Sequence, residues 1–190
     1  MHNYLDDLNV VKDILIENKI ILSPTDTVWG LGCSAYSKIA VDKIYDIKNR
    51  DADKPLILLV HNIQLLKQYI KEIHPRIETL IHFHQRPLSV IYEANENLPT
   101  YLTSDYNTVA IRVTKHPLLV DLISALGHPL VSTSANIQGE PAPQLFSQVE
   151  SNVIEKVDYV FNEGRQLKET NPPSMLIKFD EDGELIFLRK

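Results

Sequence analysis

Hydroxyl groups, a carboxylate and two glycines lie close together in SPTDTVWGLG, residues 23–32. Short polar side chains beside glycines let backbone amides approach a small polar ligand closely. The same residues also suit a tight turn after a strand, in which Asp26 and Thr27 cap neighbouring amides. Taken alone, the segment favours the turn.

Three basic side chains, Lys48, Arg50 and Lys54, lie in KNRDADKPL, residues 48–56. An arginine could clamp phosphates through its forked donors, and a lysine could do so as a point charge. They could instead neutralise the dipole at the C-terminus of a helix. Because residues 38–54 hold five bases and four acids, the stretch is not a polybasic patch. By itself it favours the dipole interpretation.

Three hydroxyls and an amide follow a short apolar run in LVSTSANIQGEP, residues 130–141. In open α/β sheets, ligands bind beyond the carboxyl ends of the strands. A Ser/Thr-rich stretch is also typical of the cap of a following helix. One cap needs one hydroxyl and not three, so the two interpretations are evenly balanced.

Arg112 is the one charged residue of TVAIRV, residues 108–113. A buried arginine is costly unless it is paired. We therefore expect Arg112 to meet an anion, which could be a structural carboxylate or a ligand. The three segments above repeat one pattern, a buried strand followed by small polar residues, and Arg112 adds a fourth element.

Composition narrows the class of protein. The chain has 190 residues, of which 44% are hydrophobic and 23% charged, as in one globular domain spanning 1–190. The single cysteine, Cys33, excludes an intrachain disulfide and a four-cysteine zinc site, and it favours a reducing, cytoplasmic location. A net charge of −6 argues against general polyanion binding. The N-terminus does not resemble a signal peptide, and the longest apolar run, 56–60, is too short to span a membrane.

The elements that must position these residues follow from apolar periodicity and from turn residues. Helices are predicted over 5–17, 37–48, 62–70, 75–83 and 117–126. Strands are predicted over 20–22, 56–60, 88–92, 108–113, 130–132, 174–179 and 184–188, the last two joined by a hairpin turn at 181–183. Interspersed helices and strands with short links predict a single α/β domain with a twisted mixed sheet, parallel and antiparallel, and flanking helices.

Four blocks of the sequence resemble the signature blocks of the YrdC/TsaC family, the threonylcarbamoyl-AMP synthases. They are PTDTVWGLGCSA, IYDIKNRDADKPL, TVAIRVTKHPL and PLVSTSANIQGEP. They occur in the family's order and spacing from about Asn18 to Pro143, with weaker similarity to Ser174. The resemblance implies the short, single-domain form and a YrdC-like fold with an open concave ligand cavity. The chain departs from the family at 84–87, where HQRP stands in place of a Trp-Pro-Gly-Pro stretch.

The resemblance implies an enzyme that joins L-threonine, bicarbonate or CO2 and ATP. Its products would be threonylcarbamoyl-AMP and pyrophosphate. A downstream threonylcarbamoyl-transferase complex would then modify adenosine 37 of tRNAs that read ANN codons. Mg2+ is expected with ATP, held mainly by phosphate oxygens and water, and no dedicated metal site is expected.

The resemblance also implies a role for each residue that matches the family's motifs. Contacts with L-threonine would come from Thr27, Arg112 and Ser132. Contacts with ATP would come from Lys48, Arg50, Lys54, Thr108, Ser134, Asn136 and Ser174. Lys48 and Arg50 would also be the catalytic residues, because positioning and charge neutralisation do most of the work in such transfers.

Two alternatives remain at this point, a double-stranded RNA-binding module and an inactive family paralogue. A concave basic face could accept RNA, but the net charge of −6 weighs against RNA binding as the main role. An inactive paralogue would tend to lose the Ser-Ala-Asn or Lys-x-Arg block. This chain keeps both, at 134–136 and 48–50, which favours the active enzyme. Some contact with tRNA stays possible beside that activity.

Overall fold

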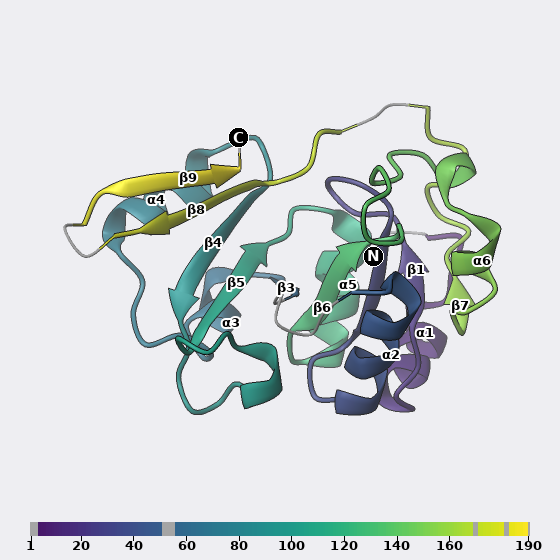
Figure 1. The fold of residues 1–190 in the computed structure, drawn as a ribbon, viewed down its shortest axis with the longest axis horizontal. Coiled ribbons are helices and arrows are strands. Elements are labelled where there is room, and N and C mark those ends of the chain that lie inside the picture. The colour runs from purple at the N-terminus through teal and green to yellow at the C-terminus, as the bar shows by residue number, and fades with distance from the viewer. Residues whose placement is uncertain (1–3, 51–55, 169–170, 181–182, 190) are drawn as a thin grey trace.

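The computed structural model describes residues 4–50, 56–168, 171–180 and 183–189. Within these ranges, nine strands form one sheet in the order β7-β1-β2-β6-β3-β5-β4-β8-β9. Figure 1 shows this sheet crossing the molecule from β7 on the right to β9 at the upper left. The strands are β1 (Ile21–Ser23), β2 (Gly30–Ser34), β3 (Ile57–Val60), β4 (Leu88–Glu93), β5 (Thr108–Val113), β6 (Leu130–Ser134), β7 (Tyr159–Val160), β8 (Met175–Phe179) and β9 (Leu185–Arg189).

The sheet is mixed, as predicted. The pairs β1–β7, β3–β5 and β4–β8 are parallel. The pairs β1–β2, β2–β6, β3–β6, β4–β5 and β8–β9 are antiparallel. The expected α/β class with flanking helices is therefore confirmed.

The helices are α1 (Leu8–Ile16), α2 (Lys38–Lys48), α3 (Ile63–Leu66), α4 (Pro75–Phe83), α5 (Pro117–Leu126) and α6 (Ser151–Ile154), with short 3-10 turns at Thr100–Leu102 and Phe146–Gln148. Two of them begin with proline at the first helical position, where its missing N–H is tolerated. The Ser37 side chain caps α2 by accepting from the Ala40 amide. Asn49 ends α2 in the left-handed region, with φ at 49°, and so turns the chain toward Arg50.

The core lies between the sheet and its helices. Buried apolar residues of α1 and α5, such as Val11, Leu15 and Leu119, pack against the sheet's central strands, where Leu31, Leu58 and Val131 are also fully buried. Burial of a side chain of this size stabilises a fold by about 1.5–3 kcal/mol. No helix among the described residues is long and apolar enough to cross a membrane.

Strand β2 was not predicted, because its sequence, GLGCS, alternates glycines with buried Leu31 and Cys33. The glycines are there because neighbouring strands crowd them. A Cβ on Gly30 would lie 3.1 Å from the Thr133 carbonyl oxygen, and one on Gly32 would lie 3.3 Å from the Val131 carbonyl oxygen. The polar loop therefore ends before Gly30 instead of running to residue 32.

Three further expectations need correction. The helix predicted over 62–70 is only the single turn α3, because the chain then turns to bridge Ile70 with Ala94. No helix follows Ser134 directly, so the interpretation of 132–134 as a helix cap is wrong. Strand β7 and helix α6 were also missed, because both are too short to show a period.

The β8–β9 hairpin is confirmed, although residues 181–182 of its predicted turn lie outside the described residues.

Candidate functional site

A cavity of about 340 Å³ lies over one face of the sheet. Its floor is a row of facing residues on adjacent strands. Ser132 of β6 faces Ile57 of β3, Ile57 faces Ala110 of β5, and Ala110 faces Ile91 of β4. Because side chains alternate along a strand, residues two apart on these strands also reach the cavity, as Thr108, Arg112 and Ser134 do.

The cavity brings together the separate segments singled out in the sequence. Seven of the predicted site residues line it, namely Thr27, Arg50, Thr108, Arg112, Ser132, Ser134 and Ser174. Lys48 and Asn136 are not among the residues that line it, and they lie just behind it. Lys54 falls outside the described residues, so its predicted contact stays a prediction.

Three guanidinium groups give the cavity a positive character. Arg50, Arg112 and Arg189 line it, and no carboxylate does so among the described residues. The local charge is therefore opposite to the net charge of −6 of the whole chain. Clefts lined by one sign of charge raise the local concentration of ligands of the other sign.

Arg112 is 4% exposed, and its NH2 atom lies 2.9 Å from Asp26 Oδ1. Asp26 Oδ2 in turn accepts from the Thr114 hydroxyl and the Lys115 amide, each at 3.3 Å. Burial lowers the pKa of Arg112, and the nearby Asp26 carboxylate opposes that shift. A structural carboxylate therefore meets Arg112, one of the two anions expected for it. Arg112 Nε is buried without a hydrogen-bond partner in the described part of the chain.

Lys48 is 2% exposed and its ammonium holds the loop that follows β6. Its Nζ donates to the Ser134 carbonyl at 2.5 Å and to the Asn136 carbonyl at 2.6 Å. The Gln138 amide donates to the Lys48 carbonyl at 2.8 Å. Burial, and then the charge of Arg50, lower the pKa of Lys48 to about 8. Lys48 thus ties the end of α2 to the Ser134–Asn136 segment behind the cavity.

The loop between β1 and β2 is shaped by a threonine that the sequence analysis did not single out. Thr25 Oγ1 donates to the Val28 carbonyl at 2.7 Å and accepts from the Thr27 amide at 3.0 Å. A turn is therefore present, but Thr25 caps it, whereas Asp26 was expected to. The Asp26 carboxylate instead reaches β5 and the residues that follow it.

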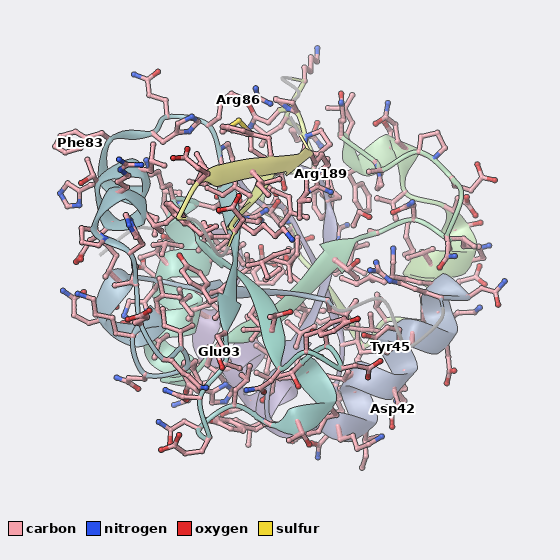
Figure 2. All side chains as sticks on the ribbon, turned by 60° about the vertical axis from the view of Figure 1, so that its left-hand side comes forward. Asp42, Tyr45, Phe83, Arg86, Glu93 and Arg189 are labelled. Carbon is pink, nitrogen blue, oxygen red and sulfur yellow. The ribbon has the colours of Figure 1, made fainter. Side chains whose placement is uncertain are left out.

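Arg189 is the second cavity residue that the sequence analysis missed. It lies on β9, as labelled in Figure 2. Its Nε donates to the Ser174 carbonyl and its NH2 donates to the Ser174 hydroxyl, both at 2.9 Å. The Ser174 hydroxyl also lies 2.9 Å from that of Ser89. The sequence showed Arg189 only as a charge at the end of an apolar strand, because its partner Ser174 is 15 residues away, just before β8.

No group of three or more His, Cys, Asp or Glu side chains in the described ranges could hold a metal ion. Cys33 is buried, and burial raises the pKa of its thiol, which keeps it protonated and unreactive. The site therefore offers cationic groups and hydroxyls that bind and orient anions, with apolar surface from Ile57, Ile91 and Leu176 beside them.

Residues 13–190 match the model of the Sua5/YciO/YrdC family, whose description reads "telomere recombination". The chain belongs to this family. It is 38% identical over 154 residues to a protein named threonylcarbamoyl-AMP synthase in Escherichia coli O1:K1, covering 78% of this chain and 81% of that protein. The protein of the same name in Shigella flexneri matches equally well.

Solved structures of family members share the fold. The structure of P. abyssi Sua5 complexed with L-threonine matches with a TM-score of 0.86 and 31% identity. The match covers 96% of this chain and 53% of Sua5, so the chain spans about half the length of that relative. E. coli YciO matches with a TM-score of 0.84 over 96% of this chain and 88% of YciO, and its 20% identity shows the fold alone.

Proposed function

We propose that this member of the Sua5/YciO/YrdC family is a threonylcarbamoyl-AMP synthase. It would use L-threonine, bicarbonate or CO2 and ATP, and release pyrophosphate. The observation that carries the proposal is the cavity itself, where three arginines and several hydroxyls surround a small apolar floor. One carboxylate and one triphosphate are the charges that such a set of groups can neutralise. The 38% identity to proteins named for this activity supports the same conclusion.

The L-threonine end of the site is proposed to lie near Arg112, Thr27 and Ser132. Asp26 forms an ion pair with Arg112 NH2. Arg112 Nε, in contrast, donates no hydrogen bond to another described residue. A guanidinium carries five N–H donors, so a contact of NH2 with one carboxylate leaves Nε–H and further N–H groups for another. The Sua5 structure complexed with L-threonine supports a threonine site in this family.

The ATP end is proposed to lie near Arg50, Thr108, Ser134 and Ser174, with Arg189 added by the structure. The phosphate contact falls mainly to Arg50, since Lys48 already donates to two carbonyl groups. Lys48 and Asn136 are then positioning residues that hold Ser134 in place. Lys54 keeps its predicted nucleotide contact. Mg2+ would be held by ATP oxygens and water, and it would neutralise phosphate charge.

The reaction needs orientation more than acid–base chemistry. The threonine amine adds to CO2 and loses a proton, giving an N-carboxylate. An oxygen of that carboxylate attacks the α-phosphorus of ATP, and the bond to the β-phosphate oxygen breaks to release pyrophosphate. Arginines fixed around both reactants lower the charge repulsion between the two anions. Their fixed positions also provide the alignment that in-line attack requires.

The proposal includes a downstream step. Threonylcarbamoyl-AMP would pass to a threonylcarbamoyl-transferase complex that modifies adenosine 37 of tRNAs reading ANN codons. Direct contact with tRNA is part of the same proposal. So is a cytoplasmic location, which the single cysteine favours.

The test is a direct assay. The purified chain is incubated with ATP, bicarbonate and labelled L-threonine, and the products are separated. We expect equal amounts of pyrophosphate and labelled threonylcarbamoyl-AMP, both dependent on bicarbonate. Pyrophosphate formed without threonine, or ADP in place of pyrophosphate, would contradict the proposal.

A further inference from the structure

A second cavity, of about 310 Å³, lies on the other face of the sheet. On β5, Val113 lines this cavity, whereas its neighbour Arg112 lines the first one. On β4, Leu88 lines the second cavity and Ile91 the first. Successive side chains of a strand point to opposite faces, and no described residue lines both cavities. The second cavity is therefore a separate site.

The walls of this second cavity carry a cluster of nitrogen donors. Arg86 and His84 come from the loop after α4, and Lys115 and His116 come from the residues just before α5. Arg86 is labelled in the upper part of Figure 2. The loop after α4 and the residues before α5 therefore place these nitrogen atoms around one cavity.

One acidic side chain, Asp26, also lines this cavity. Its charge is already matched, because Arg112 and the Lys115 amide engage its two oxygens. Lys115 Nζ donates to the His84 carbonyl at 2.6 Å and keeps two further N–H groups. Arg86 and Lys115 thus leave the cavity with a surplus of positive charge.

Two more features show unused hydrogen-bonding capacity. His116 Nδ1 is buried and has no hydrogen-bond partner in the described ranges. His116 is also the N-cap residue of the ten-residue helix α5, and its side chain makes no capping bond. The start of α5 adds the positive end of the helix dipole, although its first residue, Pro117, has no N–H to donate. A buried polar atom without a partner is costly, so a bound acceptor would relieve this cost.

We propose that this second cavity binds a small phosphate-bearing anion. Arg86 and Lys115 supply charge, and the His116 side chain supplies a hydrogen bond through its unpartnered Nδ1. Donors from several elements suit a tetrahedral anion with three or four oxygens better than a planar carboxylate with two. The volume admits inorganic phosphate or pyrophosphate with bound water. The proposal stands apart from the reaction assigned to the first cavity, because it rests on different residues.

The test is calorimetric titration of pyrophosphate, and separately of inorganic phosphate, into the wild-type chain at low ionic strength. The diagnostic variant is Arg86→Ala, because Arg86 is exposed and lines this cavity. The matched control is Arg76→Ala, an exposed arginine on α4 that lines neither cavity. The first cavity is monitored in parallel with Arg50→Ala.

We expect Arg86→Ala to weaken one class of pyrophosphate sites at least fivefold, and Arg76→Ala to change it less than twofold. That class should persist in Arg50→Ala. The imidazole NMR signals of His116 should shift during the titration of the wild type. Pyrophosphate binding that vanishes in Arg50→Ala and is untouched by Arg86→Ala would overturn the proposal.

A second variant is needed if Arg86→Ala changes pyrophosphate affinity too little to measure. Arg86→Glu reverses the charge at the same exposed position and should abolish this class of sites without lowering the melting temperature. A short RNA duplex is titrated as a further arm. RNA binding that is lost in Arg86→Glu, with no pyrophosphate binding in the wild type, would overturn the small-anion proposal in favour of a nucleic-acid surface.

Discussion

Asp26 and Arg112 form a buried ion pair that stands between the two cavities of the molecule. Their side chains are 11% and 5% exposed, and Asp26 Oδ1 lies 2.9 Å from Arg112 NH2. Asp26 lines one cavity and Arg112 the other. Asp26 therefore balances the charge of the guanidinium that we assign to the threonine carboxylate.

Replacing Asp26 with asparagine should loosen that guanidinium without removing it. The change leaves a buried charge without its partner, which costs on the order of 3 kcal/mol of stability. We expect a lower melting temperature and a higher KM for L-threonine, with the affinity for ATP nearly unchanged. Asp105→Asn, at an exposed turn, is the control. A normal KM in a destabilised Asp26→Asn would leave Asp26 with a purely structural role.

Replacing Arg112 with lysine should weaken threonine binding specifically. Lysine keeps the charge, but it cannot contact Asp26 and a second carboxylate through one planar fork. We expect the Kd for L-threonine to rise about tenfold or more, from the loss of about 1.5–3 kcal/mol of charge-assisted bonding. Calorimetric titration of each ligand into the folded variant measures this. Unchanged threonine affinity would leave Arg112 as no more than the ion-pair partner of Asp26.

Arg50 and Lys48 should give different phenotypes, although they are neighbours in one motif. Arg50 lines the cavity, so Arg50→Ala should weaken ATP binding about tenfold or more. Lys48→Ala removes the donor to two buried carbonyls, at about 1–3 kcal/mol for each group left unsatisfied. We expect a clear loss of stability together with weaker ATP binding. Thermal unfolding and ATP titration, run on both variants, separate the two roles.

The pH dependence of ATP binding should report on Lys48. Its pKa is about 8 in the folded chain, whereas the ordinary pKa of a lysine side chain is 10.5. Between these values the unfolded chain holds the proton and the folded chain does not, so this group makes the free energy of unfolding rise with pH in that window. The bonds to the Ser134 and Asn136 carbonyls weaken in the same window, because the neutral amine is a poorer donor.

We therefore expect ATP affinity to fall above about pH 8. Deprotonation of Lys48 should not lower the free energy of unfolding in the same range. Calorimetric titration of ATP from pH 7 to 9.5 tests this without involving the threonine amine. Lys48→Arg stays charged over this range and should lack the decline. A decline that is equally strong in Lys48→Arg would assign it to another group.

The two glycines of β2 provide a matched pair of variants. An added Cβ would be similarly crowded at both, by Thr133 O at 3.1 Å for Gly30 and by Val131 O at 3.3 Å for Gly32. We expect each alanine variant to lose about 1–3 kcal/mol of stability. Only Gly30 lines the cavity, so only Gly30→Ala should also weaken ligand binding beyond its effect on stability. Equal effects of both variants on ligand affinity would contradict this.

Sequence reasoning succeeded where one element carries its own signal. The predicted bounds of α4, β5 and α5 match the structure, because proline starts, a glycine stop and a largely apolar run define them locally. It failed at β2, where glycines required by neighbouring strands looked like a loop. The gathering of the site residues came from the family resemblance and could not come from periodicity.

The two contacts that the sequence could not show are both long-range. The partners Asp26 and Arg112 lie on a loop and a strand far apart in the chain. Lys48 looked like an exposed phosphate ligand at a helix end, but the loop after β6 folds back over it and buries it. Which polar groups a buried charge meets depends on the order of the strands, and no local pattern encodes that order.

The position of β6 between β2 and β3 has a consequence for synthesis of the chain. Both neighbours are made early, but β6 follows β3 by about 70 residues. At a ribosomal rate of about 5–20 residues per second, the edge of β3 that β6 will cover stays open for roughly 4–15 s, and that of β2 stays open longer. Open strand edges invite pairing with other chains. During this interval the nascent chain is most open to such pairing, and it gains Ser132 and Ser134 of its ligand cavity only when β6 is in place.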